Sequence, residues 1–130
     1  MAEILIVDDD HHLRQGFQRL LDAEGYETRT AASAEEALNL MWEKMPQCVV
    51  MDVRMPGMDG FEVLRSVKKS NPQVQVIILT GHGGDAEEQT AYRMGAYNFL
   101  KKPMDIDELL NSIRMAYRDK VENAMVAVSL

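Results

Sequence analysis

The sequence holds a single cysteine, Cys48, among its 130 residues. One cysteine can form neither an internal disulfide nor a cysteine-based zinc site, and such usage suits a reducing compartment. Long hydrophobic runs are absent too, since none approaches the roughly 20 residues of a membrane-spanning helix. The first residues, MAEILIVDDD, lack the basic region and the cleavage site of a signal peptide. These absences predict a cytoplasmic protein with no membrane segment.

Positive charge is also in short supply. Lys and Arg number 14 against 21 Asp and Glu, so the formal net charge at pH 7 is -7. Phosphate backbones and anionic membrane surfaces recruit Lys and Arg. The charge balance therefore argues against direct nucleic-acid binding and against a membrane partner. What the sequence does contain is 46% hydrophobic residues, enough for the core of one compact domain.

Short apolar runs alternate with segments of helical spacing along the chain. The runs predict strands over residues 4–7, 26–30, 48–51, 74–79 and 97–100. Apolar stripes predict a helix after each strand, within segments 13–21, 33–45, 61–67, 85–94 and 106–117. Five strand-then-helix units predict a doubly wound α/β fold, with helices on both faces of a parallel sheet. Binding sites in such folds lie at the carboxyl ends of the strands.

Charged and hydroxyl side chains stand at these strand ends. Asp8, Asp9 and Asp10 follow the first strand, Asp52 the third, Thr80 the fourth and Lys102 the fifth. Clustered carboxylates repel one another, and one lysine does not balance three of them. A hard divalent ion such as Mg²⁺ suits this donor set. Carboxylates, metal, hydroxyl and lysine are the parts of a phosphoryl-transfer site, in which one carboxylate can be the nucleophile.

The motifs ILIVDD, VVMDVRMPGMDG, VIILTG and FLKKP stand in this order along the chain. In this order and at these strand ends, they resemble the response-regulator receiver domain of two-component signalling. The resemblance runs from about Ile4 to Tyr117. It implies a flavodoxin-like (βα)5 three-layer sandwich with strand order 2-1-3-4-5. It also implies Mg²⁺-dependent transfer of a phosphoryl group from a phosphohistidine onto an aspartate, followed by a change of conformation.

The resemblance assigns a role to each motif residue. Asp52 corresponds to the phosphoacceptor, with Thr80 and Lys102 beside it as catalytic groups. The metal ligands correspond to Asp8, Asp9, Asp52 and the backbone carbonyl of Arg54.

Further positions correspond to the switch and to its timing. Thr80 and Phe99 match the switch hydroxyl and aromatic, and Gly81 the small position that leaves room for the phosphoryl group. Arg54 and His82 occupy the two positions that tune autodephosphorylation in this family. The family's Lys-Pro bond is often cis, which predicts a cis Lys102–Pro103 peptide.

The resemblance also implies the cofactor and the partners. The cofactor is Mg²⁺, with Mn²⁺ as a substitute. The phosphoryl donor is a sensor histidine kinase or a histidine phosphotransfer protein. Segment 85–117 is the face that binds partners or forms a homodimer on phosphorylation. Catalysis is limited to self-phosphorylation from phosphodonors and slow autodephosphorylation, so the protein is mainly a switch.

Simpler interpretations stand beside these roles. Asp10 and Asp59 are expected to cap helices or shape turns, and the adjacent His11 and His12 to lie on the surface near the site. Other functions on this fold are a flavin electron carrier, another aspartate-dependent phosphatase, and a receiver that docks without phosphorylation. Three aspartates would repel a flavin phosphate, and Arg54 stands where such phosphatases have a second acid. Residues 1–119 are predicted to form the receiver, and residues 120–130 a helix extension, linker or tail.

Overall fold

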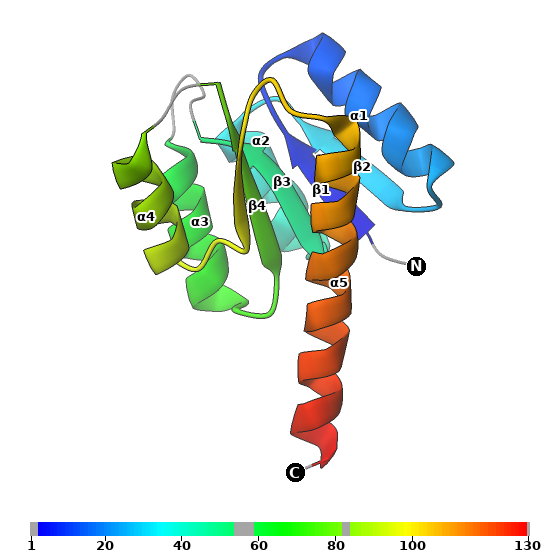
Figure 1. The fold of residues 1–130 in the computed structure, drawn as a ribbon, viewed down its shortest axis with the longest axis vertical. Coiled ribbons are helices and arrows are strands. Elements are labelled where there is room, and N and C mark those ends of the chain that lie inside the picture. The colour runs from blue at the N-terminus through cyan, green and yellow to red at the C-terminus, as the bar shows by residue number, and fades with distance from the viewer. Residues whose placement is uncertain (1–2, 54–58, 82–83, 130) are drawn as a thin grey trace.

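The computed structural model describes residues 3–53, 59–81 and 84–129, with side chains described as far as residue 119. Strands and helices alternate throughout (Figure 1). The elements are β1 (Glu3–Val7), α1 (His11–Ala23), β2 (Glu27–Ala31), α2 (Ala34–Glu43), β3 (Cys48–Asp52), α3 (Gly60–Ser70), β4 (Gln75–Thr80), α4 (Asp85–Arg93), β5 (Asn98–Lys101) and α5 (Ile106–Ser129). Every strand lies within one residue of its predicted bounds.

The five strands form one parallel sheet in the order β2-β1-β3-β4-β5. This order confirms the flavodoxin-like architecture implied by the resemblance. Strands β1 and β3 are neighbours, with Val7 opposite Met51, so the residues that follow them emerge side by side. Strands β4 and β5 are paired in the same way, with Thr80 opposite Lys101. The sheet therefore brings the predicted site residues to one edge.

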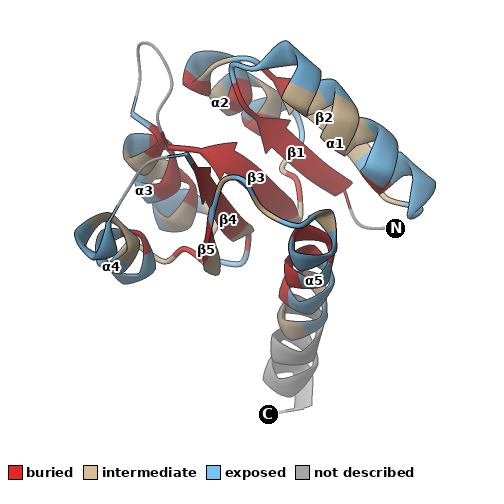
Figure 2. Cartoon of the chain, turned by 45° about the horizontal axis from the view of Figure 1, so that its top comes forward, coloured by how far each residue is buried: buried red, intermediate tan, exposed pale blue. Residues whose placement is uncertain are grey.

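Two cores lie on opposite faces of the sheet, because successive strand residues point to opposite sides. Helices α2, α3 and α4 cover one face, and α1 and α5 cover the other (Figure 2). The strand residues of the first core are Leu5, Val7, Ala31, Val49, Met51, Val76, Ile78 and Phe99. Those of the second are Ile4, Ile6, Cys48, Val50, Ile77, Leu79 and Leu100. Strands β1, β3 and β4 are thus buried on both faces, as their continuous apolar runs predict.

Helix starts follow the predicted caps. The Asp10 carboxylate accepts from the backbone N–H groups of His12 and Leu13, so this aspartate is the N-cap of α1. Asp59 caps α3 in the same way by accepting from the N–H of Phe61 at 2.9 Å. These bonds satisfy donors that a helix leaves without partners in its first turn. Both aspartates therefore have structural roles, as the sequence predicts.

Polar contacts join helix α5 to the sheet, among them one from Gln75 and one from Tyr97. The amide Nε2 of Gln75 donates to the carbonyl of Ala116 at 3.1 Å, and the hydroxyl of Tyr97 donates to the Asp119 carboxylate at 2.6 Å. Burial, together with that carboxylate, raises the pKa of Tyr97 to about 12, so the phenol stays protonated at neutral pH. The helix continues to Ser129, and the domain division at residue 119 stays a prediction. Among the described residues, no helix is both long and apolar enough to cross a membrane.

Candidate phosphoacceptor and metal site

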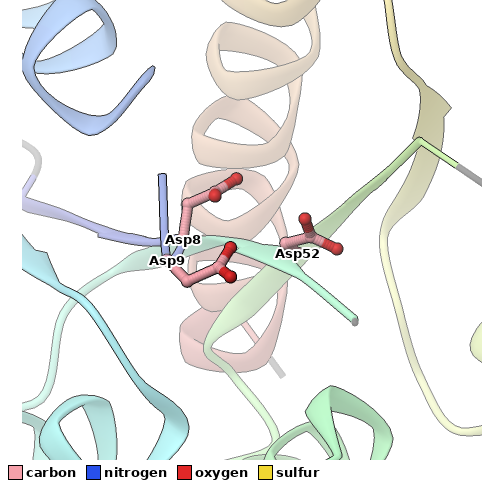
Figure 3. Close-up of side chains that lie close together, drawn as sticks. All are labelled: Asp8, Asp9 and Asp52. Atoms are coloured by element: carbon pink, nitrogen blue, oxygen red, sulfur yellow. The ribbon is translucent and has the colours of Figure 1, made fainter. Parts of the chain in front are cut away.

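Three carboxylates meet where β1 and β3 end (Figure 3). Asp8 and Asp9 directly follow β1, and Asp52 is the last residue of β3. One carboxylate oxygen from each of the three lies within 4.8 Å of the others. Asp8 and Asp52 are buried, at 2% and 8% exposure, whereas Asp9 is exposed. The predicted cluster is present, with its outer side open to solvent.

The side chain of Lys102 also reaches this cluster. Its ammonium lies 2.8 Å from Asp8 Oδ2 and 2.9 Å from Asp52 Oδ2, so it bridges two of the three acids. The backbone N–H of Lys102 also donates to the carbonyl of Thr80 at 2.7 Å, which ties the ends of β4 and β5 together. The Lys102–Pro103 peptide bond is cis. Lys102 reaches the acids, as the resemblance implies, whereas its neighbour Lys101 is exposed.

The pKa values of Asp8 and Lys102 are both shifted from their ordinary values. Burial raises the pKa of Asp8 above its ordinary value, and the hydrogen bonds from Lys102 and from the backbone N–H of Asp10 offset only part of that rise. Burial alone would lower the pKa of Lys102, but its hydrogen bonds to Asp8 and Asp52 outweigh burial and raise it. The lysine therefore stays charged at neutral pH. Among the described residues, the single charge of Lys102 thus faces a cluster of three carboxylates.

Gly60, the first residue of α3, lies in close contact with the backbone at the end of β3. A Cβ atom at this position would lie 2.6 Å from the Cα of Val53 and 2.9 Å from the carbonyl oxygen of Asp52. Only glycine allows the first turn of α3 to approach the backbone this closely. The N–H of Gly60 donates to the Val53 carbonyl at 3.1 Å. Asp52 is thus held between a paired strand and a helix start.

The other predicted residues lie around this center. Thr80 is fully buried at the end of β4, and a Cβ atom added at Gly81 would meet nothing within 4 Å. Phe99 is 6% exposed and belongs to the core under α2, α3 and α4. Its ring is therefore already inward in this structure. The family resemblance implies that this ring turns inward on phosphorylation, and that movement stays a prediction.

Some expectations concern residues beside the site or outside the described part. His11 and His12 are both exposed, with ring centroids 5.9 Å apart, as expected of surface residues. Arg54 and His82 lie outside the described residues. The metal-ligand role of the Arg54 carbonyl and the lifetime-tuning roles of both side chains therefore stay predictions.

Two side chains, Arg14 beside the site and Asn98 at the start of β5, make polar contacts that have no signal in the sequence. The guanidinium of Arg14 donates to the backbone carbonyl of Asp8 at 2.6 Å. On β5, Asn98 Oδ1 accepts from the hydroxyl of Tyr92 at 3.0 Å and from the N–H of Phe99 at 2.8 Å. Asn98 Nδ2 donates to the hydroxyl of Ser112 at 3.0 Å, so one amide joins α4, β5 and α5.

The donor set fits a small divalent cation. Carboxylate oxygens are the ligands that Mg²⁺ prefers, and Mg²⁺ commonly uses one or two of them together with water and phosphate oxygens. Asp8, Asp9 and Asp52 could supply these ligands, and a dication would reduce the repulsion among their negative charges. Such an ion would supply positive charge against which a phosphoryl group can be transferred.

Comparisons with known proteins agree with this geometry. The family model of the response regulator receiver domain matches residues 4–114. The C4-dicarboxylate transport transcriptional regulatory protein DctD of Pseudomonas aeruginosa is 41% identical over 115 residues, which are 88% of this chain and 25% of DctD. The sporulation initiation phosphotransferase F of Bacillus subtilis is 36% identical over 112 residues, 86% of this chain and 90% of that protein.

Among solved structures, the beryllofluoride-activated NtrC4 receiver domain dimer is similar with a TM-score of 0.88 and 33% identity, covering 92% of this chain and 99% of that one. The chain spans about a quarter of the length of the transcriptional regulators that it matches. Sequence, fold and site point the same way: the chain belongs to the response regulator receiver domain family of two-component systems.

Proposed function

We propose that this chain is a phosphorylation-controlled switch whose phosphoacceptor is Asp52. The observation that carries the proposal is the position of this carboxylate. It ends a strand that is buried on both faces, lies 2.9 Å from the ammonium of Lys102 and forms a cluster with Asp8 and Asp9. A rigid strand end with a cation beside it is a suitable mount for a nucleophile, because positioning and charge stabilisation dominate phosphoryl transfer.

The donor in this proposal is a phosphohistidine of a sensor histidine kinase or a histidine phosphotransfer protein. A carboxylate oxygen of Asp52 attacks the phosphorus, and an O–P bond forms as the N–P bond breaks. The electron pair of the broken bond stays on the imidazole nitrogen, which then takes up a proton. The product is an acyl phosphate on Asp52. Lys102 is placed to attract the transferred phosphoryl oxygens as a point charge.

Mg²⁺, or Mn²⁺ in its place, is the proposed cofactor. Asp8, Asp9 and Asp52 would hold it, together with the Arg54 carbonyl that the family resemblance implies. Without a cation, the buried Asp8 is stabilised only in part, as the raised pKa of its carboxyl group indicates. In this proposal, the metal ion is therefore already bound when Asp52 is ready to accept a phosphoryl group.

The readout proposed for phosphorylation is the surface formed by α4, β5 and α5. Thr80, at the end of β4, is placed to move its hydroxyl toward a phosphoryl group on Asp52. Because Phe99 is already buried, we place the remaining change in the packing of α4 on β5. This surface would bind a partner or a second copy of the chain. A local change of charge at Asp52 would thus alter a binding surface elsewhere in the domain. The setting proposed is the cytoplasm.

The proposal is tested with a small phosphodonor, such as acetyl phosphate, in the presence and absence of Mg²⁺. Intact-mass analysis compares the wild type with Asp52→Asn and with Asp59→Asn. The second variant removes an exposed capping carboxylate and serves as the matched control. The wild type and Asp59→Asn should each gain one phosphoryl group only with metal, and Asp52→Asn should gain none.

Equal labelling of Asp52→Asn, or labelling without metal, would overturn the assignment. A wild-type chain that stays unlabelled would favour a receiver that docks without phosphorylation. Size-exclusion chromatography of the labelled product tests the proposed homodimer. Its elution should move toward a larger size only after phosphorylation.

A further inference from the structure

The carboxylate of Asp9 is the least supported member of the cluster. Asp8 and Asp52 both hold the ammonium of Lys102. Within the described part of the chain, no hydrogen bond or ion pair holds the Asp9 side chain, and that side chain is exposed. Its direction must therefore come from its backbone.

Both peptide groups that flank Asp9 are anchored by side chains. The Asp8–Asp9 peptide presents the Asp8 carbonyl, which accepts a 2.6 Å hydrogen bond from Nη1 of Arg14. The Asp9–Asp10 peptide presents the Asp10 N–H, which donates to Asp8 Oδ1 at 2.9 Å. Because each peptide group is planar, holding both planes restricts φ and ψ of the residue between them. Arg14 and Asp8 together thus aim the Cα–Cβ bond of Asp9.

Arg14 is itself well placed for this task. It is half-buried in the first turn of α1, and its own N–H donates to the Asp10 carbonyl at 3.0 Å. Its second terminal nitrogen, Nη2, lies 3.2 Å from Nδ1 of His11, which accepts when the imidazole proton is on Nε2. A planar guanidinium can hold two acceptors in a fixed geometry, which a single ammonium cannot do.

We infer that Arg14 is a positioning residue for the metal ligand Asp9. Its guanidinium orients the peptide that carries Asp9 and so prepares this carboxylate to bind a divalent cation. This role rests on the proposed function, because it requires that Asp8, Asp9 and Asp52 bind the cation. Arg14 touches neither the cation nor the phosphoryl group in this proposal.

A positioning role of Arg14 can be distinguished from a simple effect of its charge, because the two predict opposite changes in cation affinity when Arg14 is replaced. A positive guanidinium near the cluster repels a dication, so removing its charge alone would strengthen metal binding. Removing a residue that positions a ligand weakens metal binding, typically by roughly 10-fold or more for groups that orient metal ligands. The direction of the change in affinity therefore decides between them.

The experiment measures Mn²⁺ binding to the unphosphorylated chain by electron paramagnetic resonance of the free ion. Arg14→Met should raise the dissociation constant roughly 10-fold. Arg14→Lys keeps the charge but not the planar fork, and should raise the constant by less. Arg19→Met removes an exposed arginine of the same helix and should leave the constant unchanged. Thermal unfolding of each variant shows that the fold is retained.

A second readout is the Mg²⁺ dependence of phosphorylation from a small phosphodonor. Arg14→Met should raise the Mg²⁺ concentration for half-maximal rate and leave the rate at saturating Mg²⁺ little changed. Wild-type affinity or tighter binding in Arg14→Met would overturn the positioning role and leave the proposed function intact. Absence of Mn²⁺ binding by the wild type would overturn the metal site and this role together.

Discussion

Replacing Gly60 by alanine tests whether the close approach of α3 to β3 holds the phosphoacceptor in place. The added Cβ atom would lie 2.6 Å from the Cα of Val53 and 2.9 Å from the carbonyl oxygen of Asp52. Carbon atoms that are not bonded settle at roughly 3.5–4.0 Å, so the two backbones must separate by about 1 Å. Neither backbone atom can swing aside as a flexible side chain could. The strand end that carries Asp52 must therefore move.

The expected loss of stability follows from two opposing effects. Overpacking of this kind costs about 1–3 kcal/mol. The better helix propensity of alanine returns at most about 1 kcal/mol. With the full offset, the net loss is up to about 2 kcal/mol, which lowers Tm by up to roughly 8 °C for a domain of this size. A displacement of about 1 Å at Asp52 relative to Lys102 should also slow phosphoryl acceptance by roughly 100-fold.

Urea denaturation gives the first quantity, and the initial rate of labelling by a small phosphodonor gives the second. Gly16→Ala is the matched control, because a Cβ atom at this position in α1 would meet nothing within 4 Å. It should stabilise the protein by roughly 0.5–1 kcal/mol and leave the labelling rate unchanged. If Gly60→Ala matches Gly16→Ala in both measurements, the close approach does not position Asp52.

Two further predictions concern polar networks away from the acids. Burial alone would raise the pKa of Glu3, but Lys44 and Arg29, at 2.8 and 2.5 Å, outweigh burial and lower this pKa below 4.5. A lowered pKa stabilises the fold above the unfolded-state value and loses this effect as pH falls through the folded-state value. Glu3→Gln should therefore lower the free energy of unfolding by about 1–2 kcal/mol at pH 7. In urea titrations, the difference in stability between this variant and the wild type should narrow below pH 4.5. A difference that does not change with pH would contradict this role of Glu3. Asn98→Ala removes the amide that joins α4, β5 and α5, and should cost about 1–3 kcal/mol and speed amide hydrogen exchange in α4. The exposed Asn111→Ala should leave that exchange unchanged, and equal exchange in both variants would show that the amide does not hold α4.

Much of the site could be predicted from sequence because parallel sheets align their carboxyl ends. The apolar run before Asp52 identifies a doubly buried strand, and a carboxylate at its end needs a chemical reason. The same logic places Asp8, Asp9 and Lys102 at one edge. Strand order is different, since periodicity alone does not say which strands are neighbours. That order came from the family resemblance and is confirmed by the pairing.

The remaining contacts could not be predicted, for physical reasons that differ among them. Arg14 binds a backbone carbonyl, and every residue has one, so no sequence pattern marks this acceptor. The amide of Asn98 meets Tyr92 and Ser112 only after α4 and α5 have packed against β5. The inward ring of Phe99 depends on which conformation is populated, and a motif cannot specify that choice.

The hydrogen bond between the backbones of Lys102 and Thr80 limits how the ends of β4 and β5 can move when Asp52 is phosphorylated. At 2.7 Å, it makes the ends of β4 and β5 a single mechanical unit. Sliding one strand past the other would break this bond, whereas turning the Thr80 hydroxyl about its own χ1 would leave it intact. After phosphorylation of Asp52, we therefore expect side chains at this edge to rotate while the backbones of β4 and β5 keep their register. Loss of the phosphoryl group would then restore the starting conformation by side-chain rotation alone, with no strand pairing to be formed again.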